Sequence, residues 1–171
     1  ENGTNAPLIT KGDTQFSIKH TASNSRFQFL TYDGSYHTTD VELSEIDYSY
    51  GDWVHVAGVY NASSSSISIY INGTEKGSTD SAGITSNGYK VALGENLEKP
   101  DRDLSGTDLD EVRIYNESLT SSEIQSISTA SSSVSKESSL SMYREGSLEL
   151  IDHGSSKEVA NPIIINKTRY L

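Results

Sequence analysis

The sequence contains no cysteine among its 171 residues. This absence excludes a disulfide scaffold, a zinc site with thiolate ligands and a cysteine nucleophile. No apolar run approaches the roughly 20 residues of a membrane-spanning helix and no signal peptide is recognisable, so we expect no direct membrane insertion. The chain begins at Glu1 without a methionine, which indicates a processed or truncated product.

Positive charge is also scarce. Thirteen Lys and Arg stand against 24 Asp and Glu, giving a net charge of -11, and no basic run exists. Such a chain repels a phosphate backbone, so we do not expect nucleic acid as a partner. Catalytic patterns are missing too, because there is no Gly-x-Ser-x-Gly motif and the histidines at 20, 37, 55 and 153 are scattered. The sequence therefore predicts a protein that is not an enzyme.

Short β-prone segments make up most of the remaining chain, and clusters of Gly, Asn, Asp and Ser separate them. This spacing favours an all-β fold, an antiparallel β-sandwich or jelly roll. The segments are 16–20, 26–32, 40–43, 53–60, 67–71, 89–94 and 110–115.

The stretch GDWVHVAGVYNASSSSISIYINGTEKG, residues 51–77, shows the strand pattern most clearly. Ile67, Ile69 and Ile71 alternate with polar residues and so share one face of a strand. Asn72-Gly73 is typical of a type I′ hairpin turn, in which both central residues need a positive φ.

A single helix is expected, over 119–127. Thr120 and Glu123 have the spacing of a capping box, and Leu119 and Ile124 that of a hydrophobic staple. Residues 128–139, STASSSVSKESS, read as a Ser-rich linker. We therefore expect one domain over 1–127, and beyond the linker a β-prone tail over 140–171 that is either a strand donor or the start of a further domain.

Five Asn-x-Ser/Thr sequons indicate a secreted glycoprotein, because several fall at expected turns where a glycan can project. Their asparagines are Asn2, Asn61, Asn72, Asn116 and Asn166.

The segments LITKGDTQFSI, DWVHVAGVYN, ISIYINGTEKG and GTDLDEVRIYNESLTSSEI resemble, in that order, laminin-G-like domains of the concanavalin A-like lectin and glucanase jelly rolls. The resemblance covers roughly residues 8–127 and implies that Trp53 and His55 belong to the framework. It also implies two further strands upstream of this chain's start, so the tail, a lost segment or a neighbouring molecule must fill their place.

The glycoside hydrolases that share this fold use two carboxylates from one inward strand. Asp110 and Glu111 are adjacent, so on a strand they point to opposite faces and cannot flank one bond. Asp110 shares parity with Val112 and Ile114 and is expected to face inward. Two interpretations stay open for it: a hydrogen-bonded framework carboxylate, or a calcium ligand at the sandwich rim together with Asp101, Asp103 and Asp108.

For ligand binding, the loop TYDGSYHT combines aromatic and polar groups in Tyr32, Tyr36 and His37. An ordinary hairpin tip is the alternative for this loop. The resemblance implies a noncatalytic recognition or adhesion module at the cell surface, with a glycan or a surface protein as partner. The second interpretation is a structural subunit of a surface layer or filament, in which copies of the chain assemble by strand complementation through the C-terminal tail.

Overall fold

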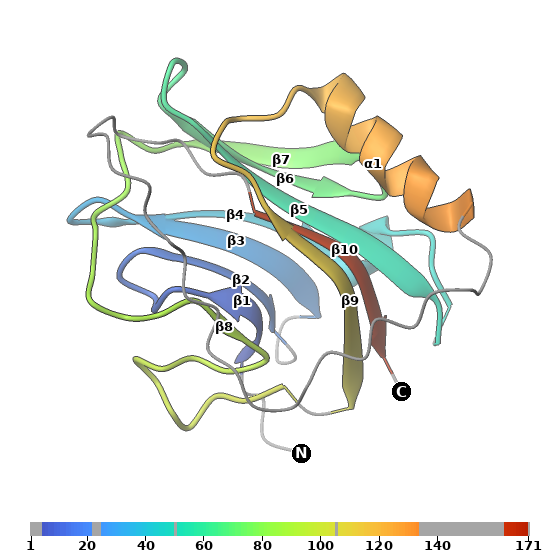
Figure 1. Ribbon diagram of the computed structural model, residues 1–171, viewed down its shortest axis with the longest axis horizontal. Helices are drawn as coiled ribbons and strands as arrows, with labels where there is room; N and C mark the ends of the chain where they lie inside the picture. The colour runs from blue at the N-terminus through green and yellow to red at the C-terminus, as the bar shows by residue number, and fades with distance from the viewer. Residues whose placement is uncertain (1–4, 22–24, 50, 105, 134–162, 171) are drawn as a thin grey trace.

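The structure is a two-layer antiparallel β-sandwich, which confirms the predicted all-β fold (Figure 1). The computed structural model describes residues 5–21, 25–49, 51–104, 106–133 and 163–170, and for 131–133 and 163–170 the backbone alone. The elements are β1 (Asn5–Thr10), β2 (Phe16–Thr21), β3 (Arg26–Tyr32), β4 (Tyr36–Glu42), the 3-10 turn η2 (Leu43–Glu45), β5 (Trp53–Asn61), β6 (Ser66–Ile71), β7 (Thr74–Asp80), β8 (Ala92–Leu93), β9 (Thr107–Ile114), α1 (Ser121–Ser133) and β10 (Ile163–Tyr170).

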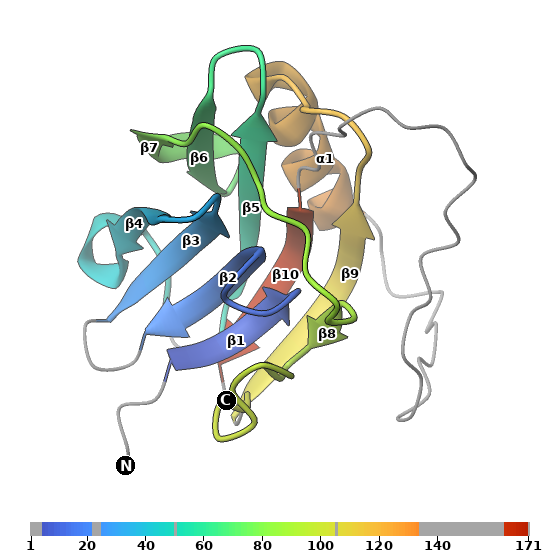
Figure 2. The ribbon, with the colours of Figure 1, turned by 90° about the vertical axis from the view of Figure 1, so that its left-hand side faces the viewer.

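Within the described residues, two five-stranded sheets form the layers. Sheet A has the order β4-β3-β2-β1-β8, and sheet B has the order β7-β6-β5-β10-β9 (Figure 2). Neither β1 nor β7 was among the expected strand segments, although the predicted Asn72-Gly73 hairpin implies a strand where β7 lies. The second of these, TEKGSTD, has no apolar alternation that would mark it as a strand, and it forms because β6 supplies its backbone partners.

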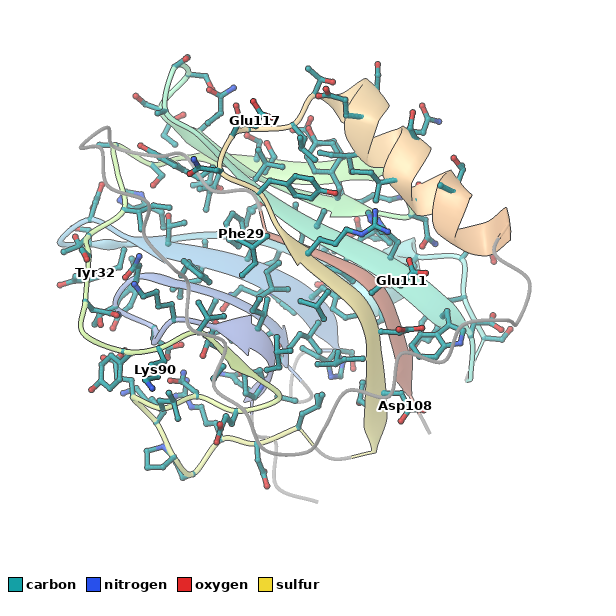
Figure 3. The ribbon with its side chains drawn as sticks, in the orientation of Figure 1. Phe29, Tyr32, Lys90, Asp108, Glu111 and Glu117 are labelled. Atoms are coloured by element: carbon teal, nitrogen blue, oxygen red, sulfur yellow. The ribbon has the colours of Figure 1, made fainter. Side chains whose placement is uncertain are left out.

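The core lies between the sheets and follows the alternation of the strands. Ile67, Ile69 and Ile71 are all buried in it, as their spacing predicts. Phe29 of β3 lies between the two layers (Figure 3). A Cβ placed at Gly58 of β5 would lie 2.6 Å from the Phe29 ring, so the absence of a side chain there allows the sheets to approach.

Two local predictions are confirmed in detail. Asn72 and Gly73 both have positive φ, 49° and 79°, as a type I′ turn requires. In the capping box, the Thr120 backbone N–H donates to Glu123 Oε2 at 2.7 Å and the Glu123 N–H donates to Thr120 Oγ1 at 3.3 Å.

Helix α1 continues beyond the expected end at 127, as far as Ser133. Hydroxyl groups in this part bond to carbonyls of the preceding turn: Ser126 Oγ donates to Ser122 O, and Thr129 Oγ1 donates to Gln125 O. A Ser-rich composition that favours a linker is therefore compatible with helix here. The predicted domain boundary at 139 and residues 140–162 of the predicted β-prone tail lie outside the described residues.

Strand β10 occupies a central position. It lies antiparallel between β5 and β9, although the chain reaches it only after α1 (Figure 1). The position between β5 and β9 is filled by this C-terminal strand of the same chain.

Candidate functional site

The outer face of sheet A carries a row of polar side chains. Backbone pairing sets Lys19 opposite Gln28 and Gln28 opposite Asp40, so these three residues lie side by side across β2, β3 and β4. Their sequence neighbours Ile18 and Phe29 point the other way, into the core. The Gln28 side-chain amide donates to Asp40 Oδ1 at 2.6 Å, which joins β3 to β4 within this row.

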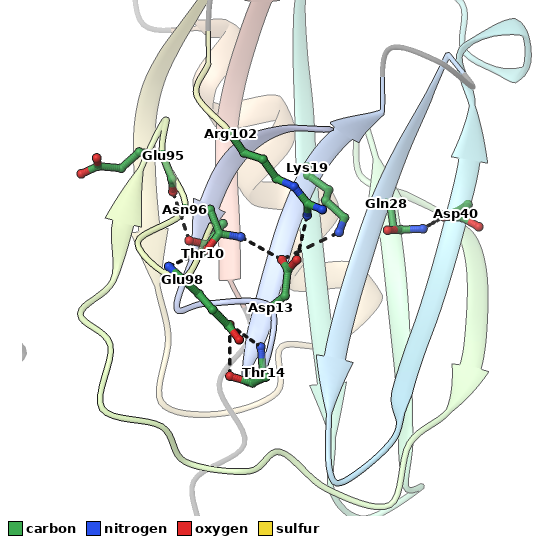
Figure 4. A network of polar contacts seen from close by, with 10 residues as sticks. All are labelled: Thr10, Asp13, Thr14, Lys19, Gln28, Asp40, Glu95, Asn96, Glu98 and Arg102. Atoms are coloured by element: carbon green, nitrogen blue, oxygen red, sulfur yellow. Dashed lines mark hydrogen bonds and ion pairs between the residues drawn. The ribbon is translucent and has the colours of Figure 1, made fainter. Parts of the chain in front are cut away.

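A buried charged network lies beside this row (Figure 4). Asp13, in the turn between β1 and β2, accepts a hydrogen bond from the Asn96 amide at 2.9 Å and one from the Arg102 guanidinium at 2.8 Å. Lys19 Nζ is 3.8 Å from Asp13 Oδ1. Asp13 and Lys19 are each only 5% exposed. Burial lowers the pKa of Lys19, and the nearby Asp13 carboxylate opposes that effect only in part.

The same turn is tied to the chain around β8 by further hydrogen bonds. Glu98 Oε2 accepts from both the backbone N–H and the hydroxyl of Thr14, at 2.9 and 3.1 Å. The Asn87 amide donates to the Lys11 carbonyl at 2.7 Å. Gly12 has φ 68°, and a Cβ there would lie 2.7 Å from Glu98 Oε2, so this position needs glycine. The turn is therefore held rigidly over the outer face of sheet A.

Two of the three predicted ligand-binding residues lie together. The rings of Tyr32 and Tyr36 are 4.9 Å apart and tilted by 55°, on directly paired positions of β3 and β4. Tyr36 is 57% exposed. Burial of part of the ring, and then the carboxylates of Glu98 and Asp13, raise the pKa of Tyr36, which places its hydroxyl in the field of the charged network.

His37 is not part of this pair. It follows Tyr36 along β4 and its Nε2 is 2.9 Å from Asp33 Oδ1 in the β3–β4 turn. This hydrogen bond is the main cause that lowers the pKa of Asp33. His37 therefore orders the turn. Because successive residues of a strand point to opposite faces, the two tyrosines are the members of the predicted set of three that lie on the outer face.

The predicted inward orientation of Asp110 is wrong. Leu109 and Val112 both pack against the core, although their spacing would put them on opposite faces of a regular strand. The residue between, Glu111, has φ 50°, which switches the direction of the side chains at this point. As a result Asp110 is exposed.

The four aspartates predicted for calcium, Asp101, Asp103, Asp108 and Asp110, are all exposed. Within the described ranges, no three His, Asp or Glu side chains gather closely enough to hold a metal ion. Asp108 and Glu111 lie along β9, far across the molecule from Tyr32 (Figure 3). Calcium binding stays a prediction, and the structure gives it no preformed site among the residues that it describes.

The framework residues predicted for β5 differ from each other. His55 is buried, and its backbone N–H donates to Asn72 Oδ1 at 3.0 Å, which fixes the β6–β7 turn to β5. Trp53 is 39% exposed and does not fill the core. The strand end is therefore ordered by the Asn72 amide rather than by the indole.

Two sequon asparagines lie in turns, and their side-chain amide oxygens accept backbone hydrogen bonds. Asn61 Oδ1 accepts from the backbone N–H groups of Ser63 and Ser64, and Asn72 Oδ1 accepts from β5. In both asparagines a glycan would attach to the side-chain amide nitrogen, which takes no part in these hydrogen bonds. The Asn72 turn packs against α1, since a Cβ at Gly73 would lie 2.9 Å from Gln125 Cα. Asn116 is exposed, Asn2 lies outside the described residues, and only the backbone of Asn166 is described.

Sequence reasoning did not find the network of Asp13, Lys19, Asn96 and Arg102. The strand itself gave no signal, because FSIKH alternates apolar Phe16 and Ile18 with polar Ser17 and Lys19, as an ordinary half-buried strand does. The partners of Asp13 could not be read, since Asn96 and Arg102 are 83 and 89 residues away from it. No helix in the described part of the chain is long and apolar enough to cross a bilayer.

Comparison with known proteins gives two findings. A crystal structure of an S-layer domain-containing protein (residues 221–444) from Clostridium thermocellum is similar at 19% identity and a TM-score of 0.36, over 74% of this chain and 64% of that one. No curated protein matches. The family described as "Concanavalin A-like lectin/glucanases superfamily", with a laminin-G-type domain model, matches residues 1–125, which span β1 to β9 and leave β10 outside. The match confirms the resemblance read from the sequence, and the chain belongs to the concanavalin A-like lectin/glucanases superfamily.

Proposed function

We propose that this chain is a noncatalytic extracellular recognition module that binds a carbohydrate on the outer face of sheet A. The observation that carries the proposal is the Tyr32–Tyr36 pair, whose outer ring is exposed on the same face as a row of fixed polar groups. Sugars offer apolar C–H faces and many hydroxyls, and an exposed tyrosine beside planar amide and carboxylate groups complements both. Domains of this family typically bind rather than catalyse, which supports the same assignment.

The pre-ordering of the face also supports binding. Gln28 and Asp40 are joined at 2.6 Å, and Arg26 Nη1 is 3.4 Å from Asp40 Oδ2. Groups that are already held by neighbours lose little conformational entropy when a ligand arrives. The face therefore offers rigid donors and acceptors next to one adaptable aromatic side chain.

A panel of immobilised glycans tests the proposal. The intact protein should bind at least one glycan class, and Tyr36→Ala should weaken that binding about tenfold, which corresponds to the loss of one aromatic contact. Trp53→Ala is the matched control, because it removes an exposed aromatic from sheet B. Unchanged binding by Tyr36→Ala at an unchanged melting temperature would place the site elsewhere, and no binding to any glycan would leave a protein partner instead.

A second candidate function is favoured by β10. A structural subunit that assembles by strand complementation needs a strand that lies far along the chain from its partners, and β10 has this placement. This candidate predicts ordered assemblies of the chain and no soluble ligand. It does not use the face that carries Tyr36.

Two smaller proposals accompany the main one. Calcium, bound through exposed residues of the set Asp101, Asp103, Asp108 and Asp110, would raise the melting temperature by mass action. An unchanged melting temperature at millimolar calcium would contradict calcium binding.

Glycans on the sequon asparagines would appear in the intact mass of the natively produced protein. We expect Asn61 to be modified more fully than Asn72, whose turn is packed against α1.

A further inference from the structure

The slot between β5 and β9 is one strand wide and is filled by β10. Neighbouring strands lie roughly 4.8 Å apart, so β5 and β9 would be separated by about twice that distance without it. Both strands then have an unpaired row of backbone N–H and C=O groups facing the slot. A β-strand is therefore the occupant that satisfies the slot, because it bonds to both sides at once.

The register of β10 matches its apolar half to apolar neighbours. Ile163 lies opposite Gly58 on β5 and Ile114 on β9, and Ile165 lies opposite Val56 and Val112. Val56 is fully buried, and Val112 and Ile114 pack against the core. The register thus pairs isoleucine positions of β10 with apolar positions of the two flanking strands.

The other half of β10 matches by charge. Lys167 lies opposite Asp110, and Arg169 lies opposite Asp108. Opposite charges at directly paired positions stabilise an antiparallel pair, and like charges destabilise it. A slip of one residue would lose both of these charge pairings. The slot therefore matches a strand whose N-terminal half is apolar and whose C-terminal half is basic.

We propose that this slot takes the β10 of a second copy of the chain, so that two molecules exchange their C-terminal strands. The paired backbone and the register are the same whether β10 comes from its own chain or another. The roughly 30 residues between Ser133 and Ile163 extend to about 100 Å at most, which is enough to reach a neighbour. The balance then depends on protein concentration against the effective concentration of the chain's own strand. This inference is independent of carbohydrate binding; it rests on the second candidate function, assembly by strand complementation, and specifies it as a mutual exchange of β10 between two copies.

The absence of native cysteine allows a direct test by disulfide trapping. Arg113 is exposed and lies opposite Ile164. Directly paired Cα atoms in antiparallel strands are about 4.5–5.5 Å apart, within the range of a disulfide. The variant with both Arg113→Cys and Ile164→Cys should close within one chain at low concentration. Equal amounts of the two single variants, incubated together at high concentration and then oxidised, should give a disulfide-linked pair containing one of each.

The matched control replaces Arg113→Cys by Asp108→Cys, which lies five residues along β9 and out of register with Ile164. Cross-linking of the mixed single variants above this control, and rising with concentration, supports exchange. If the double variant closes while the mixed single variants give no more cross-linking than the control, strand exchange is wrong. If the double variant does not close, β10 does not occupy this slot in solution, and the proposal fails as well.

A charge reversal provides the second test. One chain carries Asp108→Lys with Asp110→Lys, and the other carries Lys167→Glu with Arg169→Glu. Each chain alone has like charges across the slot, whereas a mixture can restore both pairings only between copies. We expect a one-to-one complex in the mixture that neither variant forms alone, detected by its mass in solution. A mixture that stays as two separate species would overturn the proposal. Glycan binding through Tyr36 is measured separately, so either idea can fail without the other.

Discussion

The two sheets cover their outer faces by different means. Sheet B is covered by α1, and the contact is apolar: Ala57, Val59 and Tyr70 of the sheet pack against Ile124 of the helix. Sheet A is covered in part by the β1–β2 turn and the chain after β8, and the contact is polar, centred on Asp13 and Lys19. Apolar contacts tolerate small shifts, whereas buried charges need each partner in place. The polar cover is therefore the more brittle of the two, and it also keeps hydrogen-bonding groups at the surface of the candidate site.

The largest effect should come from breaking the polar cover at its centre. Asp13→Ala leaves Lys19 buried without its carboxylate, and we expect a loss of about 3–5 kcal/mol in the free energy of unfolding. Chemical denaturation measures it. The double variant Asp13→Leu with Lys19→Met removes the buried Lys19–Asp13 pair and should recover part of the loss, because Asn96 and Arg102 still lose their acceptor. A loss below about 1 kcal/mol for Asp13→Ala would show that water or the Asp40 carboxylate compensates for Lys19, and the two covers would then be equally tolerant.

Breaking the apolar cover should cost less. Ile124 is fully buried in a small cluster at the edge of the molecule, and Ile124→Ala should lower the free energy of unfolding by about 2–3 kcal/mol through a cavity that the helix can partly close. Ser122→Ala, on the exposed side of the same helix, is the control and should change stability by less than about 0.5 kcal/mol. A loss larger than that of Asp13→Ala would reverse the order of the two covers.

The smallest effect is a difference in alkaline pH dependence. Burial lowers the pKa of Lys19 below 10.5, so the unfolded chain binds the proton more tightly, and the contribution of Lys19 to stability rises with pH between its lowered pKa and 10.5. Burial raises the pKa of Tyr70 above 10.0, so its contribution is complete below 10.0 and is lost as pH rises through the raised pKa. The two covers thus respond with opposite sign.

Stability curves of Lys19→Met and Tyr70→Phe, each subtracted from the wild type between pH 9 and 11, separate these contributions. We expect the Lys19 difference to grow with pH in favour of the wild type and the Tyr70 difference to shrink. Two difference curves with the same slope would contradict the assignment of burial as the main cause at one of the sites.

The difference between the covers also explains what could be read from the sequence. Ile67, Ile69 and Ile71 indicated their core face, and Thr120 with Glu123 indicated the start of α1, because both patterns depend on spacing within one element. The outward turn of Asp110 could not be read, since it follows from a positive φ at Glu111, a residue type that rarely adopts one.

The second limit of prediction from the sequence was the contact between residues that lie far apart along the chain. The Asp13–Arg102 contact joins segments that only the finished sheet brings together, and no local pattern encodes it. The tyrosine pair was predicted as a candidate site, but its separation from His37 depends on the pairing of β3 with β4. The tail was recognised as β-prone, and its slot follows from the apolar and charged register with β9.

The central position of β10 has a consequence for the order of folding. Its partners on β5 precede it by roughly a hundred residues, so sheet B closes through contacts of very long sequence separation, which are slow to form. During synthesis, β5 and β9 leave the ribosome before the strand that joins them. The nascent chain therefore passes through a state in which sheet A and the hairpins of sheet B can form while the edges of β5 and β9 that face the slot remain unpaired. In this interval, neighbouring nascent chains on one messenger RNA would be best placed to exchange β10 strands.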